Sequence, residues 1–229
     1  MSSDEPTYIQ ALALGLDPAW RRRSDEERHD DAIRFAEAEA AAEVDGVRSI
    51  TYSSIGLEPG VDLLFWRMAP TIDGLETAAA ALLRAGLGRW LTVRHSLVGL
   101  VGPSQYVKKP TDQEQSLFSG ERSRYLVVYP FTKSTDWYLL SREARQGVMN
   151  EHMKVGHEYP TVRQALAYSF GLDGQDFVVA YETDDLVVFG DLVRALRGTE
   201  SRRSTVRDTP ILLGIQRPVD EIVSLLGAP

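Results

Sequence analysis

The chain has 229 residues, of which 43% are hydrophobic and 25% are charged, a composition typical of a globular protein with one large domain or two small ones. The formal net charge of −8 excludes a nucleic-acid groove held by bulk positive charge, and the absence of cysteine excludes disulfides, thiolate metal sites and cysteine nucleophiles. No apolar run approaches the length of a membrane span and no export signal is recognised, so we expect a cytoplasmic protein without nucleic-acid or membrane partners.

The first half of the chain, residues 1–101, predicts the element order β-α-β-β-α-β. Alternating apolar residues or runs of β-branched and aromatic residues predict strands over residues 9–16, 47–56, 61–68 and 90–101. The first helix opens at a capping box of Ser24 and Glu27 and continues to about residue 44. Asp73 is the expected N-cap of the second helix, because apolar residues at helical spacing follow it.

A polar segment over residues 102–123 is too long for an ordinary connection, so we interpret it as a functional or crossing loop. Residues 124–229 then predict the order β-α-β-β-α-β a second time, with strands over residues 125–131, 162–170, 177–182 and 211–215. Ser141 begins one helix, and an apolar stripe from Leu186 to Leu196 marks the other, with Asp184 and Asp185 at its N-terminus. Two such halves in tandem indicate an α+β fold of two ferredoxin-like units packed sheet to sheet.

Histidine chemistry is restricted to four side chains. His29 lies among charged residues at a helix start, and His95 lies in a predicted strand, so surface or packing positions are expected for both. His152 and His157 are five residues apart near the end of a helix, a poor spacing for two ligands on one helix face. Either one could instead be the single axial ligand of a flat iron cofactor.

Tyr129 ends a strand before Pro130, and Lys133 follows four residues later, which places a phenol and an ammonium near one rim of the sheet. The simpler interpretation is a tyrosine whose ring packs while its hydroxyl meets water. The residues alone leave both interpretations open.

Six stretches of the second half form a pattern in residue type and order. They cover residues 129–138, 151–159, 169–177, 181–182, 200–203 and 210–214. This pattern resembles the chlorite dismutase family of heme proteins, densely from residue 124 to residue 214 and mainly by element order before that. The resemblance implies a dimeric α+β barrel built from two tandem ferredoxin-like halves, assembled as a homopentamer. It implies that residues 124–229 bind the porphyrin and that residues 1–101 hold no cofactor.

The family contains two main activities that particular residues separate. Chlorite dismutases carry an arginine on the distal side of heme, and the matching position here is Gln164. Coproheme decarboxylases have a residue other than arginine there, together with a Tyr-Pro-x-x-Lys motif that Tyr129 and Lys133 match. The sequence therefore resembles the coproheme decarboxylase branch more closely.

The resemblance also implies roles for individual side chains. The context Glu151-His152 marks His152 as the proximal iron ligand, whereas His157 lies where relatives often have an arginine. Tyr129 is then the expected redox relay, Gln164 the distal residue, and Lys133 a group that holds a propionate or moves a proton. Positive charge for the propionates is expected first from Arg203, with further contributions from Arg202, Arg207, Lys108 and Lys109. Tyr106 lies where relatives have a tyrosine near the propionates.

The implied reaction is the oxidative decarboxylation of iron coproporphyrin III (coproheme) to heme b, with hydrogen peroxide as oxidant. Residues 102–124 would then cover the porphyrin as a lid, and Trp137 is expected to pack rather than react. Two alternatives remain open at this stage: a chlorite dismutase, and a heme-binding or structural pentamer without turnover.

Overall fold

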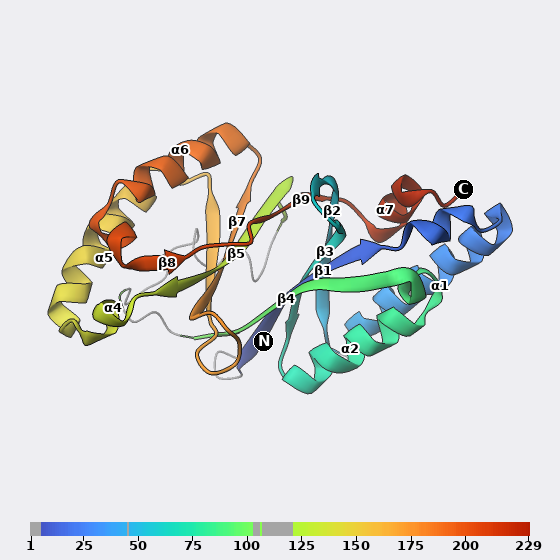
Figure 1. The fold of residues 1–229 in the computed structure, drawn as a ribbon, viewed down its shortest axis with the longest axis horizontal. Helices are drawn as coiled ribbons and strands as arrows, with labels where there is room; N and C mark the ends of the chain where they lie inside the picture. The colour runs from blue at the N-terminus through green and yellow to red at the C-terminus, as the bar shows by residue number, and fades with distance from the viewer. Residues whose placement is uncertain (1–5, 45, 103–105, 107–120) are drawn as a thin grey trace. The chain divides into compact units, whose positions relative to one another are not determined.

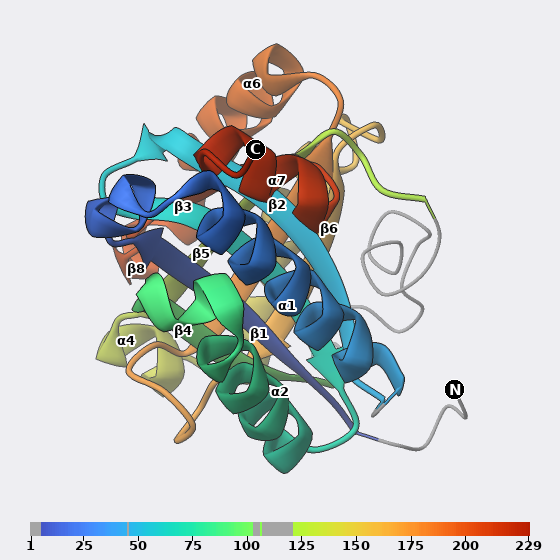
Figure 2. The same cartoon turned by 90° about the vertical axis from the view of Figure 1, so that its right-hand side faces the viewer.

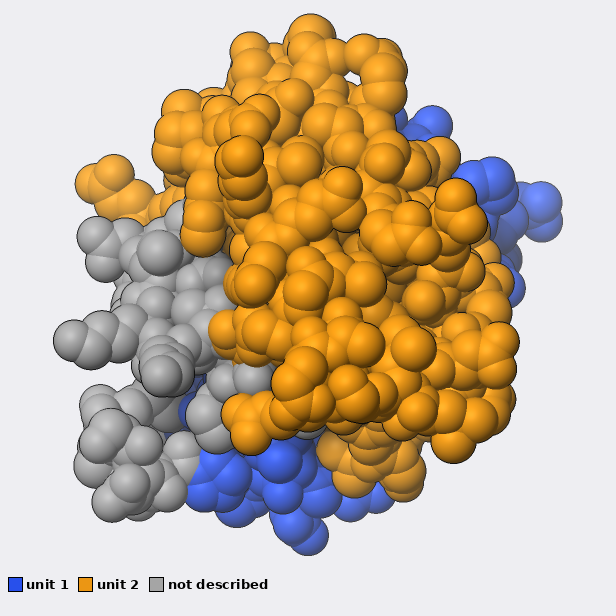
Figure 3. All heavy atoms as spheres, turned by 90° about the vertical axis from the view of Figure 1, so that its left-hand side faces the viewer, with its two compact units in different colours: residues 1–101, 213–229 blue, residues 102–212 orange. Residues whose placement is uncertain are grey.

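The computed structural model describes residues 6–44, 46–102, 106 and 121–229, and the chain divides into two compact units (Figures 1 and 3). Unit 1 comprises Met1–Val101 together with Leu213–Pro229, and unit 2 comprises Gly102–Leu212. The C-terminal segment therefore groups with the first half of the chain, whereas the sequence assigned it to the second. The reason is pairing over long sequence distances: Ser54 Oγ donates to the Leu213 carbonyl at 2.8 Å, and Thr51 Oγ1 donates to the Arg217 carbonyl at 2.6 Å.

Unit 1 is built on an antiparallel sheet in which β1 lies between β4 and β3, and β3 pairs with β2. The strand bounds are β1 Thr7–Leu16, β2 Arg48–Glu58, β3 Val61–Ala69 and β4 Leu91–Val101. The predicted strands and the hairpin of β2 and β3 are confirmed. Residues of β9 (Leu212–Gln216) add to β2, with Ile215 opposite Ser53.

Three helices of unit 1 lie on one face of its sheet (Figure 2). They are α1 Asp25–Val44, α2 Ile72–Arg84 and α7 Val219–Leu226, and two short 3-10 helices cover Pro18–Arg22 and Gly86–Trp90. The capping box is confirmed, because the Glu27 amide donates to Ser24 Oγ at 3.2 Å and the Glu27 carboxylate accepts from the Ser24 amide at 3.0 Å.

The predicted N-cap of α2 is wrong. Thr71 has the extended backbone that a cap requires, and its hydroxyl accepts a hydrogen bond from the Gly74 amide at 3.1 Å. Asp73 already lies in the first turn, where its negative charge favours the N-terminus without capping it.

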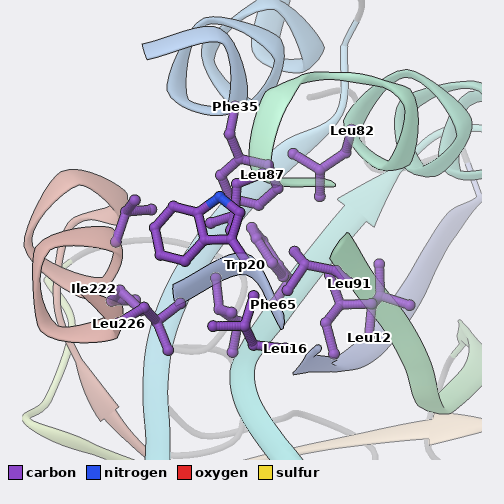
Figure 4. Close-up of a cluster of buried hydrophobic side chains, with 13 residues drawn as sticks. Leu12, Leu16, Trp20, Phe35, Phe65, Leu82, Leu87, Leu91, Ile222 and Leu226 are labelled. Atoms are coloured by element: carbon purple, nitrogen blue, oxygen red, sulfur yellow. The ribbon is translucent and has the colours of Figure 1, made fainter. Parts of the chain in front are cut away.

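The main core of unit 1 fills the space between its sheet and these helices (Figure 4). Its largest members are aromatic, and Phe35 of α1 meets Phe65 of β3 edge-on at 6.4 Å between ring centroids. Trp20 is fully buried and donates its indole N–H to Asp31 at 2.9 Å. The remaining members are leucine, isoleucine and valine side chains of both helices and strands, Leu12, Leu14, Leu16, Leu63, Leu82, Leu87, Leu91, Ile222, Val223 and Leu226.

Unit 2 has a smaller antiparallel sheet in which β7 lies between β6 and β5, and a short β8 pairs with the end of β5. The strands are β5 Tyr125–Lys133, β6 Arg163–Tyr168, β7 Phe177–Thr183 and β8 Thr205–Arg207. The helices are α4 Thr135–Leu139, α5 Arg142–Gly156, α6 Leu186–Arg197 and the 3-10 helix η4 Glu200–Ser204.

The predicted helix starts of unit 2 are confirmed. Ser141 caps α5 by accepting from the Ala144 amide at 3.2 Å, and Asp185 caps α6 by accepting from the amides of Val187 and Val188. Helices α5 and α6 lie on the same side of β5 and β7 (Figure 1). Among the described residues of the whole chain, none of the helices combines the length and apolar character that a membrane crossing requires.

Candidate active site in unit 2

One face of the unit 2 sheet brings together residues from its three long strands. Gln164 of β6 lies opposite Tyr181 of β7, and Tyr129 of β5 lies opposite Val179, the next residue of β7 on the same face. Tyr129, Val179 and Tyr181 pack with residues of α6, so this is the face that the helices cover. The structure therefore places two predicted site residues, Tyr129 and Gln164, on the same surface.

The cover over this face is incomplete. Helix α5 has no fully buried side chain, whereas α6 buries Leu192. Leu166, which shares the face with Gln164, is 39% exposed, and in the following turn Phe170 is 48% and Leu172 is 52% exposed. Partly exposed apolar side chains on this face suit a flat hydrophobic ligand with a few polar anchors.

His152 lies on α5, and its Nδ1 atom is 3.5 Å from Thr199 Oγ1. Burial, together with the positive charge of Lys133, lowers the pKa of His152 to about 4. The imidazole is therefore neutral at pH 7 and can offer a nitrogen lone pair to a metal. His157 is exposed at the C-cap of the same helix, so burial distinguishes the two histidines.

Lys133 is buried at the end of β5. Its ammonium donates to three acceptors, the Ser201 carbonyl at 2.9 Å, Ser201 Oγ at 2.9 Å and Thr205 Oγ1 at 3.2 Å. It also lies 4.7 Å from the ring centre of Trp137, which is buried as predicted. Burial, together with the positive charge of Arg202, lowers the pKa of Lys133 to about 8.

These contacts argue against Lys133 as a holder of a propionate, whereas its expected role as a group that moves a proton stays a prediction. An ammonium has three N–H donors, and all three are already used within the protein. Its observed role is to fasten residues 201–205 to the end of β5. Its charge also acts on His152, as the lowered pKa of the imidazole shows.

Residues 199–201 connect β5 with the helix that carries His152. The Glu200 amide donates to the Glu151 carboxylate at 3.0 Å, and Ser201 accepts from Lys133. Thr199 lies beside the imidazole of His152. Three consecutive residues thus contact two separate elements, which fixes the position of the histidine helix against the strand.

Tyr129 packs against Tyr181, with ring centroids 5.9 Å apart and an interplanar angle of 27°. Burial raises the pKa of Tyr129, and the negative charge of Asp208 raises it as well. A hydrogen bond from the Tyr181 hydroxyl and the positive charges of Arg197 and Arg202 act in the opposite direction. Arg202 in turn donates to Asp208 at 2.6 Å. The phenol therefore lies within the electrostatic influence of a small arginine and aspartate cluster.

The predicted basic residues occupy different places. Arg202 belongs to the charged cluster near Tyr129, whereas Arg203 is exposed and pairs with Glu200 at 3.2 Å, so Arg203 does not join the other predicted side chains. Arg207 donates to the Gly174 carbonyl at 2.8 Å. Lys108 and Lys109 lie outside the described residues, as does most of the predicted lid.

Tyr106 lies beside the helices of unit 2. Its ring meets Trp137 edge-on with centroids 6.5 Å apart, and its carbonyl accepts from Gln146 of α5 at 3.4 Å. Burial raises the pKa of its phenol, so the hydroxyl stays protonated at neutral pH and can donate a hydrogen bond.

Sequence reasoning named Tyr181 in the resembling pattern without a site role, and it missed Thr199 and Asp208. The alternation along β7 places Tyr181 on the same face as Gln164 once the register is known, but a single sequence does not give that register. Thr199 and Asp208 flank the basic motif at residues 200–203, and no local pattern marks them as neighbours of His152 and Tyr129.

The donor set limits the kind of metal that could bind. The described residues contain no group of three or more histidine, aspartate or glutamate side chains that could hold a metal ion. A single neutral imidazole fits an iron porphyrin, whose macrocycle supplies further ligands of the metal.

Comparison with known proteins agrees with this geometry. The sequence profile described as "Chlorite dismutase" matches residues 26–217. The chain is 30% identical over 177 residues to the coproheme decarboxylase of Mycolicibacterium smegmatis, covering 76% of this chain and 75% of that protein. It is 29% identical over 148 residues to the chlorite dismutase of Ideonella dechloratans, covering 61% of this chain and 52% of that protein.

Solved structures show the same likeness over nearly the whole chain. A variant of the chlorite dismutase of Candidatus Nitrospira defluvii matches with a TM-score of 0.87 at 31% identity, covering 96% of this chain and 95% of that one. A protein described as putative chlorite dismutase TA0507 matches with a TM-score of 0.85 at 25% identity, covering 97% and 99%. These matches confirm the predicted α+β fold class, and the chain belongs to the chlorite dismutase family.

Proposed function

We propose that this protein is a heme-dependent enzyme that converts iron coproporphyrin III to heme b by oxidative decarboxylation, with hydrogen peroxide as the oxidant. The observation that carries the proposal is a neutral, half-buried imidazole on α5, in a unit whose sheet carries Tyr129 and Gln164 on the same face as the partly exposed Leu166. The 30% identity to a coproheme decarboxylase supports the choice of reaction.

His152 would hold the iron through one imidazole nitrogen. When bound, the iron porphyrin supplies the site where peroxide is reduced. Each propionate loses carbon dioxide, one proton and two electrons to become a vinyl group, and one peroxide accepts two electrons and two protons to become two waters. The residues of this chain orient the propionate and control where the protons go.

Tyr129 would pass electrons from the propionate. A buried phenol with a raised pKa keeps its proton at neutral pH, so it gives up an electron and that proton together. Arg202, which lies near the phenol, would attract the propionate carboxylate through its charge. Asp208 already pairs with Arg202, so a propionate would share or displace this ion pair.

Gln164 favours decarboxylation over chlorite chemistry because an uncharged amide does not steer an anion such as chlorite to the iron. Chlorite dismutation is nevertheless the second candidate function, since a chlorite dismutase matches with a TM-score of 0.87. Its signature would be oxygen evolution from chlorite by the protein loaded with heme b.

The deciding experiment is mass spectrometry of the bound porphyrin before and after peroxide is added. Decarboxylation predicts loss of two carbon dioxide molecules and formation of heme b, whereas the second candidate predicts an unchanged porphyrin together with oxygen release from chlorite. An unchanged porphyrin without oxygen release would leave only a binding or structural protein. An unchanged Soret band on addition of iron coproporphyrin would refute every function proposed here that requires a bound porphyrin.

Two variants test the residue roles. Tyr129→Phe should bind iron coproporphyrin with an unchanged Soret shift and lose turnover at least tenfold, while the matched control Tyr8→Phe in unit 1 should turn over normally. His152→Ala should lose the Soret shift itself. The homopentamer and the cytoplasmic location stay predictions, and light scattering of the purified protein would measure the number of subunits.

A further inference from the structure

Arg67 of β3 is a charged side chain in the interior of unit 1. It is fully buried, and none of its three guanidinium nitrogens has a hydrogen-bond partner among the described residues. The guanidinium carbon lies 4.8 Å from the ring centre of Phe65, a contact that favours a cation but uses none of its N–H donors. Buried donors without an acceptor are costly, so the folded protein is expected to hold an acceptor at this place.

The neighbouring strands place two more polar side chains beside Arg67. Gln10 of β1 and Ser49 of β2 both lie directly opposite Arg67 in the sheet register, so the three side chains form a row on one face. Leu12 and Phe65 share this face and belong to the core between the sheet and the helices (Figure 4). Ser49 Oγ and Gln10 Oε1 are buried and, within the described part of the chain, have no hydrogen-bond partner.

This row offers hydrogen-bond donors rather than acceptors. An arginine has five N–H donors and no acceptor, and a serine hydroxyl can donate its proton. Gln10 Nε2 lies 3.0 Å from Ser96 Oγ; with the amide reversed, its oxygen accepts from the Ser96 hydroxyl and an N–H becomes the group without a partner. A water molecule would bring two further donors, whereas an anion brings acceptors only, so an anion fits this set of side chains better.

The charge of Arg67 is only partly compensated by the protein. Burial lowers the pKa of Arg67 to about 10, so the guanidinium is still charged at pH 7. Glu39 of α1 acts on Arg67 through its charge but forms no hydrogen bond with it. Burial raises the pKa of Glu39, whereas a carboxylate in close contact with an arginine has a lowered pKa. A buried positive charge therefore remains without a negative group in contact with it among the described residues.

We propose that Arg67, Ser49 and Gln10 form an anion-binding site in the interior of unit 1, and that its ligand is a small monovalent anion of the size of chloride. The full burial of Arg67 restricts the ligand to a small one, and a single guanidinium charge matches a single negative charge. An anion held by side chains of β1, β2 and β3 stabilises unit 1 by linking three strands. The site uses none of the residues proposed to act on the porphyrin, so it does not depend on the proposed function.

The first experiment measures the Tm of the metal-free protein at constant ionic strength while chloride replaces gluconate, an anion too bulky for the site. The wild type should unfold several degrees higher in chloride, because the anion binds only the folded protein. Arg67→Met removes the guanidinium, so its Tm should be the same in both anions. Arg34→Met removes an exposed arginine of α1 and should keep the response of the wild type. Equal wild-type Tm values in the two anions, or the wild-type response in Arg67→Met, would overturn the proposal.

Crystals grown in sodium bromide locate the anion directly. Bromide scatters X-rays anomalously near its absorption edge and water does not, so an anomalous peak within hydrogen-bonding distance of the Arg67 guanidinium identifies an anion there. The wild type and Arg34→Met should both show this peak, and Arg67→Met should lack it. Water at this position without an anomalous peak, or a Glu39 carboxylate turned onto the guanidinium in its place, would refute the proposal.

Discussion

Glu182 is expected to be the most sensitive charged residue of unit 2. Its carboxylate is fully buried, and it pairs with Arg163 at 2.9 Å and with Arg122 at 3.4 Å. Breaking a buried ion pair from one side costs about 3–5 kcal/mol, because the remaining charge stays buried without compensation. The Glu182→Gln variant keeps the volume of the side chain and removes its charge, so it isolates this electrostatic effect.

The structure places the expected loss near the lower end of that range. Arg163 keeps two other acceptors, the Glu121 carbonyl at 2.6 Å and Ser123 Oγ at 2.8 Å, so its guanidinium is not left entirely without partners. We therefore expect a decrease of about 3 kcal/mol in the free energy of unfolding. For a urea slope of about 3 kcal/mol/M, the midpoint would fall by roughly 1 M.

Urea unfolding of the metal-free protein, followed by circular dichroism at one protein concentration, measures this change. Glu158→Gln is the control, because Glu158 is exposed and its substitution should change stability by less than about 0.5 kcal/mol. A loss below about 1 kcal/mol in Glu182→Gln, with an unchanged slope, would refute the view that the two arginines depend on this carboxylate.

Three further predictions concern single side chains. Arg67 is fully buried, none of its guanidinium nitrogens has a hydrogen-bond partner among the described residues, and burial lowers its pKa to about 10. Arg67→Met should therefore raise the free energy of unfolding by about 1–3 kcal/mol in urea titrations. A loss of stability would contradict this prediction. Ser24→Ala removes the capping box of α1 and should cost about 1 kcal/mol in the same assay, whereas Ser24→Asp, which retains a cap, should cost much less. The pKa of Lys133 is about 8 in the folded protein and 10.5 when unperturbed, so between these pH values the unfolded chain binds more protons than the folded protein. The free energy of unfolding, measured relative to that of Lys133→Met, should therefore be constant below pH 8 and rise between pH 8 and 10.5. A fall over that interval would show that the fold stabilises the ammonium.

Local patterns in the sequence predicted most of the elements because their causes are local. The capping box of Ser24 and Glu27, the hairpin of β2 and β3 and the N-cap Ser141 each depend on residues within a few positions of one another. The prediction of Asp73 as a cap was wrong because two polar residues, Thr71 and Asp73, compete at that helix start and backbone geometry selects the first. The placement of Leu213–Pro229 with unit 1 depends on pairing with β2, which no local signal announces.

For the candidate site, the sequence also predicted individual residues but not the partners that determine their properties. The resemblance pointed to Tyr129, Gln164 and His152, and the structure places the first two on one sheet face and the third, partly buried, on α5 beside Thr199. The partners that set their properties come from distant positions: Thr199 lies 47 residues after His152 in the sequence. Similarly, the three acceptors that occupy Lys133 lie on Ser201 and Thr205, so its structural role was not visible in the Tyr-Pro-x-x-Lys motif.

Helix α5 has an N-cap, and its apolar side chains are at most half-buried, so apolar packing holds it less firmly than α6, which buries Leu192. A flat ligand that occupied the open face beside it would act as the missing part of the hydrophobic interior of unit 2. Binding of the ligand would then also stabilise this helix, because the ligand binds the ordered helix better than the unfolded one. The backbone amides of α5 should therefore exchange with deuterium far more slowly once that ligand is bound.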